Sequence, residues 1–193
     1  MILFTTATGP HVELQRLAAA HHAGLFPDVL QLHYTEPPPA PFKRHWTKVW
    51  HLKRLFDTSL DGEQIAYFDC DVLAVQSFNL AGVLPDDKDF AAVRNAWGQY
   101  NTGVMFWRVN ERSRRVVDLV LKTHQSGQTE QPAINAYINT CRHYSLSARY
   151  NAYSYALGDK ANPYIRAWHG LGPERALREM AQWLKNESSR LNA

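Results

Sequence analysis

The sequence predicts an α/β fold with a mostly parallel central sheet flanked by helices. Apolar, strand-like segments alternate along the chain with segments in which apolar residues recur at helical spacing. One strand-like segment, Gly103–Trp107, is apolar throughout, as expected for a central strand covered on both faces. Thr5–Thr8 and Asp69–Asp71 each close a predicted strand, and open α/β sheets bind ligands at the carboxyl ends of their strands.

The elements of the first half follow from periodicity and from the turn residues between them. They are, in order, a strand over residues 1–8, a helix over Val12–Ala20, a strand over Val29–Tyr34, a helix over Thr47–Phe56 and strands over Ile65–Phe68 and Phe90–Val93. Gly9-Pro10 ends the first strand. Pro37–Pro41 is a stiff connector that is either a surface linker or a support for a loop over a site.

The second half contains the apolar central strand and most of the remaining helices. The elements predicted after that strand are helices over Val116–His124 and Gln131–Tyr144, a short strand over Ile165–Trp168 and a last helix that begins at Pro173. Pro132 falls in the first turn of its helix, where a proline removes no helical hydrogen bond. Tyr150, Tyr153 and Tyr155 lie in a loop-rich stretch and are interpreted as packing residues.

Length and composition indicate one globular domain over residues 1–193. The chain is 45% hydrophobic, an ordinary value, and no apolar run is long enough to span a membrane. The N-terminus lacks the basic start of a signal peptide, and two cysteines do not make a disulfide framework, so we expect a cytoplasmic protein. The net charge of +3 is compatible with an anionic nucleotide or a nucleic acid but requires neither.

The most informative chemistry lies in Ile65–Leu73, where a buried strand runs into two acids separated by Cys70. Because side chains alternate along a strand, we expect Asp69 and Asp71 to point the same way and Cys70 to the opposite face. Two carboxylates at the end of an apolar run need a cation, and Mg²⁺ or Mn²⁺ holding a diphosphate fits their oxygen ligands. Asp-x-Asp is the signature of nucleotide-sugar-dependent glycosyltransferases. The alternative to metal binding is that Asp69 and Asp71 lie in a solvated turn after the strand or cap the N-terminus of a helix.

Six segments in a fixed order extend this signature. They are Thr47–Trp50, Phe68–Leu73, Phe90–Val93, Tyr100–Val104, Thr129–Asn135 and Trp168–Gly172. Their order resembles the retaining glycosyltransferase family (family 8) that contains glycogenin and the bacterial lipopolysaccharide glucosyl- and galactosyltransferases, whose members have the GT-A fold. The resemblance implies that residues 1–100 form a nucleotide-binding half. Residues 101–193 would then form a donor-sugar and acceptor half with a C-terminal helix.

The resemblance also implies a role for individual residues. Asp69, Asp71 and His169 would bind the metal, Mn²⁺ or Mg²⁺, with Asp69 also near the ribose of a UDP-sugar donor. The other implied donor contacts are Thr5, Thr6 and Ala7 at the base and ribose, Lys48 at the diphosphate or sugar, Asn101, Glu130 and Gln131 at the sugar, and Gly172 and Arg175 at the phosphates.

Three positions depart from the family pattern. Thr102 replaces a serine and keeps the hydroxyl, whereas Glu130 replaces an aspartate and moves its carboxylate by one methylene. The run Gly172–Arg175 stands where the family has Lys-Pro-Trp. Lys48 could also be a solvated helix charge, and Glu130 an acid that favours a helix N-terminus. If Glu130 acts in the reaction, it either stabilises an oxocarbenium-like transition state or serves as the nucleophile of a double displacement. A third mechanism, in which the acceptor attacks on the same face as the leaving group, needs no nucleophile from the enzyme.

We therefore expect a metal-dependent, retaining glycosyltransferase that moves a hexose from a nucleoside-diphosphate sugar to a hydroxyl, with a saccharide as the acceptor. Two alternatives stay open: a phage-type enzyme that glycosylates DNA bases, and a non-catalytic nucleotide-sugar-binding protein of the same fold. No Gly-x-Gly-x-x-Gly or Walker loop is present, which disfavours Rossmann dehydrogenases and P-loop enzymes. Thr5–Pro10 also lacks the Gly-rich loop of a sugar-nucleotide pyrophosphorylase. Histidines other than His169, including His22 and His51, are interpreted as surface or helix residues.

Overall fold

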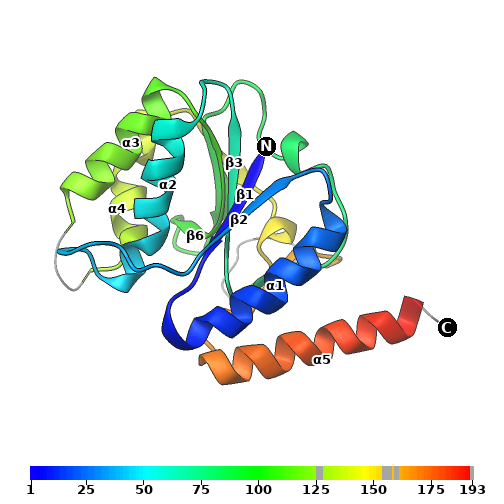
Figure 1. Cartoon of the computed structure of the whole chain (residues 1–193). Helices are drawn as coiled ribbons and strands as arrows, with labels where there is room; N and C mark the ends of the chain where they lie inside the picture. Colours follow the sequence, from blue (N-terminus) through cyan, green and yellow to red (C-terminus); the bar gives the residue numbers. More distant parts are fainter. Residues whose placement is uncertain (125–127, 154–157, 159–160, 192–193) are drawn as a thin grey trace.

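The computed structural model describes residues 1–124, 128–153, 158 and 161–191, so Tyr155 lies outside the described residues (Figure 1). The strands are β1 (Ile2–Thr6), β2 (Leu30–Tyr34), β3 (Gln64–Asp69), β4 (Val72–Ala74), β5 (Phe90–Arg94), β6 (Tyr100–Arg108), β7 (His143–Leu146) and β8 (Ile165–Ala167). The α-helices are α1 (Val12–Leu25), α2 (Thr47–Thr58), α3 (Glu111–Lys122), α4 (Glu130–Tyr137) and α5 (Pro173–Leu191). Within these ranges, no helix is both long and apolar enough to cross a membrane.

The central sheet has six strands in the order β2-β1-β3-β6-β5-β7. Three of its five neighbouring pairs are parallel, and only β6 runs antiparallel to the strands beside it. The predicted α/β fold with a mostly parallel sheet is therefore confirmed. The apolar segment Gly103–Trp107 lies in β6, an interior strand as expected.

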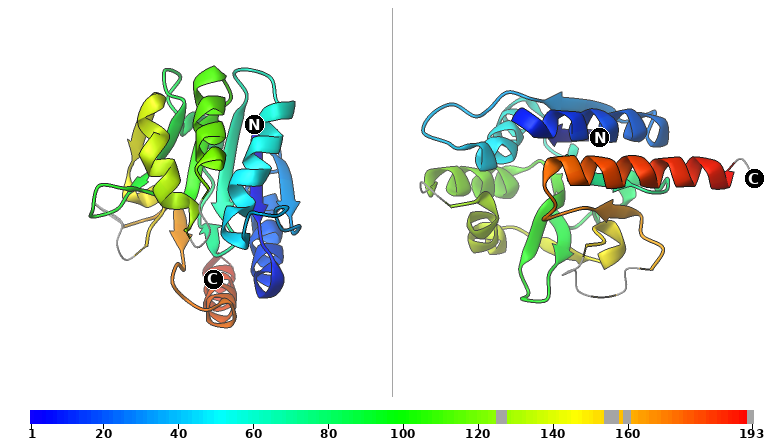
Figure 2. Two further views of the ribbon diagram at one scale, coloured as in Figure 1. Left: turned by 90° about the vertical axis from the view of Figure 1, so that its left-hand side faces the viewer. Right: turned by 90° about the horizontal axis from the view of Figure 1, so that it is seen from below.

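Alternation along the strands divides the core into two layers. In β3, Ile65 and Tyr67 pack with the apolar residues of α2, α3 and α4, whereas Ala66 and Phe68 pack on the opposite face of the sheet. Figures 1 and 2 show α2, α3 and α4 on one side of the sheet and α1 and α5 on the other. Asp69 follows Tyr67 by two residues, so the strand delivers its carboxylate toward the side of α2.

A second, two-stranded sheet positions the end of the chain near the end of β3. β4 pairs antiparallel with β8, and the backbone N–H of Trp168 donates to the carbonyl of Asp71 at 2.9 Å. Trp168, which follows β8, is buried together with Met180 of α5 and Leu14 of α1. This packing carries His169, the residue after Trp168, to the carboxyl end of β3.

Two predicted helices have different bounds in the structure. The predicted helix over Gln131–Tyr144 is wrong beyond Tyr137, because His143–Leu146 forms strand β7 and pairs in parallel with β5. The buried Asp89 accepts hydrogen bonds from the Arg142 backbone and side chain, which anchors this strand at its start. Tertiary pairing thus overrides the local helical pattern.

The helix predicted over Val116–His124 begins five residues earlier, at Glu111. Its start is a capping box, in which Asn110 accepts from the Ser113 backbone and Ser113 accepts from the Asn110 backbone. The prediction relied on apolar spacing, which begins only at Val116. The short strand β4 was not predicted, because three residues are too few to show a period.

Two of the histidines interpreted as surface or helix residues lie in helices but are buried. His22 of α1 is 0% exposed, and its Nε2 accepts a hydrogen bond from the Ala74 backbone N–H at 3.0 Å. His51 of α2 is 1% exposed and stacks on Tyr34. Burial, with smaller contributions from the neighbouring His21 and His33, lowers the pKa of His22 to about 3.

We expect acid to destabilise the protein through His22. Between pH 6.5 and 3 the unfolded chain binds a proton that the native ring excludes, so stability falls as the pH falls through this window. From pH 7 to pH 5, this group accounts for a loss of about 2 kcal/mol. Urea unfolding at both pH values should show that His22→Gln removes most of this loss, whereas His45→Gln, at an exposed position, keeps it. Equal losses in parent and His22→Gln would contradict the assignment.

Candidate functional site

A cavity of about 450 Å³ opens at the carboxyl ends of β1 and β3. β1 and β3 are hydrogen-bonded neighbours whose register pairs Thr6 with Asp69, so both strands deliver polar groups at the same level. The predicted site residues that line the cavity are Thr6, Ala7, Lys48, Asp69, Asn101, Glu130, Gln131 and His169. The structure therefore brings residues from distant parts of the chain together at one edge of the sheet.

Asp69, Asp71 and His169 form one group beside this cavity. Each residue offers one potential ligand atom, and these three atoms lie within 4.8 Å of one another. The Nδ1 atom of His169 lies 3.3 Å from Oδ1 of Asp71. Burial alone would raise the pKa of Asp71 and lower that of His169. The contact between the two side chains outweighs burial, so the pKa of Asp71 is lowered and the pKa of His169 is raised. Asp71 is thus ionised at neutral pH.

The donor set of this group fits a divalent cation. Oδ1 of Asp71 and Nε2 of His169 are buried and have no hydrogen-bond partner among the described residues. Buried polar atoms without partners are costly, and a metal ion would satisfy both at once. Two carboxylates and one imidazole together are the ligand types that Mn²⁺ and related ions accept.

The space beside His169 is kept open by Gly103 of β6. A Cβ at this position would lie 2.5 Å from Cε1 and 2.7 Å from Nε2 of the His169 ring, distances that no side chain can occupy. The same Cβ would also lie 2.9 Å from Oδ1 of Asn101. Glycine at 103 therefore lets the imidazole reach the sheet edge, and any larger residue would displace it.

Lys48 of α2 is buried between two carboxylates. Its Nζ lies 3.0 Å from Oδ1 of Asp69 and 3.0 Å from Oε1 of Glu130, and it donates to the carbonyl of Thr102 at 3.2 Å. Burial alone would lower the pKa of Lys48, but the two carboxylates outweigh it and hold the pKa above its ordinary value. Burial alone would raise the pKa of Glu130, but the positive charge of Lys48 outweighs burial, so the pKa of Glu130 is lowered. Lys48 and Glu130 are therefore both charged at neutral pH, and Lys48 is not a solvated helix charge.

The sugar-facing residues predicted in the second half form a connected wall of the cavity. Glu130 is the first residue of α4 and is 6% exposed, and its Oε1 accepts from the Thr102 hydroxyl at 2.9 Å. Oε1 of Gln131 accepts from the Thr102 backbone N–H at 3.2 Å. Oδ1 of Asn101 accepts from the side-chain amide of Asn151 at 2.9 Å. These hydrogen bonds fix the side chains of Asn101, Glu130 and Gln131 around the first residues of β6.

Three predicted donor contacts do not line the cavity. Thr5 is buried beneath it, where its hydroxyl lies 3.0 Å from Nδ1 of His33. Gly172 is exposed at the start of α5, and Arg175 points along that helix to Glu179, with Nε donating at 2.8 Å. The roles implied for Thr5, Gly172 and Arg175 stay predictions.

Sequence analysis missed Tyr67 and Arg44 as cavity residues. The Tyr67 hydroxyl donates to Oδ1 of Asp69 and lies 3.1 Å from the hydroxyl of Thr6, so it orients the carboxylate. Its position two residues before Asp69 on one strand was the signal that could have revealed it. Arg44 precedes α2 in a short 3₁₀ helix and lines the cavity opening with His45. No periodic pattern marks that stretch.

The fold is similar to those of solved glycosyltransferases. A glycosyltransferase involved in the glycosylation of the major capsid of PBCV-1 has a TM-score of 0.68 and 13% identity, covering 94% of this chain and 100% of that one. The galactosyltransferase LgtC, solved with donor and acceptor sugar analogues, has a TM-score of 0.62 and 13% identity, with coverages of 94% and 95%. GlyE of Streptococcus pneumoniae TIGR4 has a TM-score of 0.56 and 12% identity, with coverages of 96% and 64%.

No protein-family model and no curated protein sequence matches the chain. At these identities the similarity shows a shared fold. It confirms, at the level of the fold, the resemblance to glycosyltransferases of the GT-A type that the six sequence segments predicted.

Proposed function

We propose that the protein is a metal-dependent, retaining glycosyltransferase that moves a hexose from a UDP-linked sugar to a saccharide hydroxyl. The observation that carries the proposal is the convergence of Asp69, Asp71 and His169 beside a cavity of about 450 Å³ at the carboxyl end of the sheet. Cavities of roughly 300–1,000 Å³ hold small-molecule ligands. Residues 1–100 would contact the nucleotide, and residues 101–193 the sugar and the acceptor.

Asp69, Asp71 and His169 would hold the divalent metal, Mn²⁺ or Mg²⁺. The bound ion supplies positive charge to the diphosphate and stabilises the departing nucleoside diphosphate. Tyr67 holds the Asp69 carboxylate by its hydrogen bond, and Gly103 leaves room for the His169 ring. Thr6 and Ala7, at the end of β1, would border the base and ribose.

Lys48 would face the diphosphate or the donor sugar, and Asn101, Glu130 and Gln131 would face the sugar. Oε1 of Glu130 already interacts with Lys48 and with the Thr102 hydroxyl. This favours an electrostatic role for Glu130, in which its negative charge stabilises positive charge that develops on the sugar ring, over attack as a nucleophile. Retention would then follow from attack by the acceptor hydroxyl on the face that the diphosphate leaves.

The test is incubation of the protein with UDP-glucose or UDP-galactose and Mn²⁺, with release of UDP measured over time. We expect slow hydrolysis of one donor, and its loss in excess chelator. Donor binding without any UDP release, even with saccharide acceptors present, would favour the non-catalytic alternative and contradict the proposed activity.

Gly103→Ala should weaken metal binding without unfolding the protein. The added methyl group would overlap the His169 ring, so the imidazole must leave its position. Displacing a metal ligand or its support lowers affinity by roughly 10–100-fold, and Mn²⁺ titration followed by electron paramagnetic resonance measures this directly. Gly24→Ala is the matched control, because a Cβ there has no atom within 4 Å. Equal Mn²⁺ affinity in both variants would remove His169 from the ligand set.

A further inference from the structure

A second cavity, of about 420 Å³, lies between β8 and α5 and shares no lining residue with the first. Arg166 and Trp168 line it from the β8 side. The α5 side is lined by Arg178, Glu179, Gln182, Trp183 and Asn186. We call this cavity the α5 groove.

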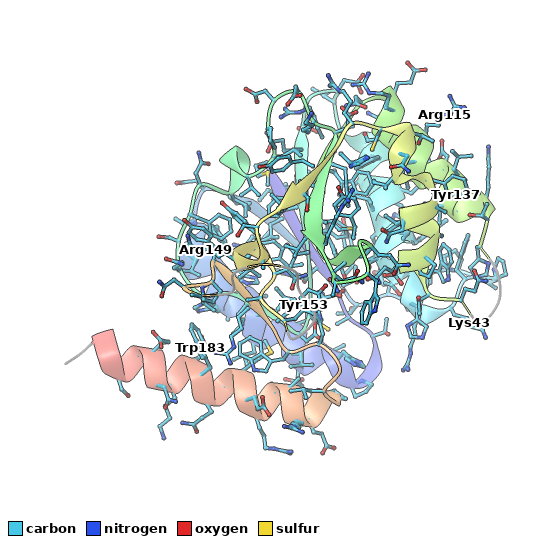
Figure 3. All side chains as sticks on the ribbon, turned by 180° about the vertical axis from the view of Figure 1, so that it is seen from behind. Lys43, Arg115, Tyr137, Arg149, Tyr153 and Trp183 are labelled. Atoms are coloured by element: carbon cyan, nitrogen blue, oxygen red, sulfur yellow. The ribbon has the colours of Figure 1, made fainter. Side chains whose placement is uncertain are left out.

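The groove lies beside the face of α5 that packs onto the protein. Ala176 and Met180 are buried against α1 and Trp168, and Leu177, Trp183 and Leu184 pack against the same cluster. Arg178, Gln182 and Asn186 recur every four residues and form a separate polar stripe. Seen from below in Figure 2, α5 lies between α1 and β8, and in Figure 3 the labelled Trp183 side chain projects from α5 toward the body of the protein. The three side chains of the stripe are exposed and line the cavity.

The groove combines one aromatic surface with hydrogen-bonding groups. Trp183 contributes a half-buried indole ring, whereas Trp168 is 6% exposed and the Arg166 guanidinium lies over it, 5.3 Å from the centre of its ring. Gln182 donates to Asn186 at 2.9 Å, so the two amides form one continuous polar edge. Sugar rings present apolar C–H faces and hydroxyl edges, which these two kinds of surface complement.

The charges of the groove favour an acidic ligand. Arg166 and Arg178 bring two guanidinium groups, whereas the only carboxylate among the lining residues, that of Glu179, accepts a hydrogen bond from Arg175 at 2.8 Å. Guanidinium groups bind carboxylate and phosphate oxygens through paired donors. The groove therefore presents net positive charge beside an aromatic surface.

We propose that the α5 groove binds an acidic saccharide that forms part of the acceptor beyond the reacting sugar. Its place in the chain supports this role: Trp168 lines the groove, and the next residue, His169, lines the donor cavity. The acceptor role rests on the proposed glycosyltransferase function, whereas saccharide binding by the groove does not.

The experiment is a calorimetric titration of the protein with tetragalacturonate, a tetramer of linked uronates, and with maltotetraose as the neutral counterpart. We expect tetragalacturonate to bind at least tenfold more tightly than maltotetraose. Arg178→Ala and Trp183→Ala should each weaken its binding at least tenfold. Arg115→Ala, on α3 and well separated from Trp183 in Figure 3, is the matched control and should bind as the parent does. UDP titration of the same variants reports separately on the donor cavity and should be unchanged.

Several results would overturn the proposal. They are absence of tetragalacturonate binding to the parent, equal binding by Arg178→Ala and the parent, and inorganic phosphate binding as tightly as the tetramer. Tighter binding of octathymidylate than of tetragalacturonate would assign the groove to single-stranded nucleic acid, which also uses aromatic and cationic side chains. Because Arg178 is exposed, its variant keeps the test valid even if Trp183→Ala fails to fold.

Discussion

Asp71→Ala should abolish metal-dependent release of UDP from the donor sugar while leaving the fold intact. The carboxylate of Asp71 is one of three groups that would hold the ion, and its Oδ1 atom has no hydrogen-bond partner in the part of the chain that the structure describes. Electrostatic stabilisation of a leaving group by such a site is worth roughly 10³-fold or more in rate. We therefore expect a loss of at least this size at saturating donor concentration.

Removal of this carboxylate should leave the fold intact but lower its stability, because the contact between Asp71 and His169 outweighs the cost of burying the two groups. Circular dichroism and thermal unfolding of Asp71→Ala test this, and Asp87→Ala, at an exposed position, is the control for activity. Wild-type UDP release from a folded Asp71→Ala protein would show that the metal site lies elsewhere.

Lys48→Met should destabilise the protein by about 3–5 kcal/mol, because breaking a buried ion pair leaves an uncompensated charge. Here two carboxylates would lose their partner: Glu130 is 6% exposed, and the Asp69 side chain is 26% exposed. Urea unfolding measures the change. In the Lys48→Met, Glu130→Gln double variant, part of the lost stability should return, since one of the two stranded charges is gone.

Lys53→Met provides the matched control on the same helix. Lys53 pairs with Asp57 and Asp118 near the surface, and exposed ion pairs contribute only about 0–1 kcal/mol. If Lys48→Met lowers the free energy of unfolding no more than Lys53→Met does, the buried charge network does not stabilise the native state as described.

The parts of the site that lie on regular elements could be predicted from the sequence. Asp69 ends the buried strand β3 and Asp71 lies in the turn that follows, and alternation along the strand predicted both at the ligand-binding edge. The resemblance carried by six short segments added Lys48 and His169, which no periodicity links to Asp69. In the structure Lys48, Asp69 and His169 line one cavity, and Asp71 lies beside it with Asp69 and His169.

The parts that depend on tertiary contacts could not be predicted. Strand β7 forms because it pairs with β5 and because Asp89 holds Arg142, and neither interaction leaves a local signal in the sequence. The burial of His22 depends on the packing of α1 against β4. Arg175, which the resemblance implies at the phosphates, pairs with Glu179 one turn further along α5, and its role at the phosphates stays a prediction.

The measurement that tests the central claim most directly is calorimetric titration of UDP into the protein, first with Mn²⁺ and then with excess chelator. We expect UDP to bind with Mn²⁺ and to bind at least tenfold more weakly once the metal is removed. His169→Ala should reproduce the chelator result at limiting Mn²⁺. Equal UDP affinity with metal and with chelator, in a protein shown to be folded, would contradict the assignment of Asp69, Asp71 and His169 as a metal site for the donor diphosphate.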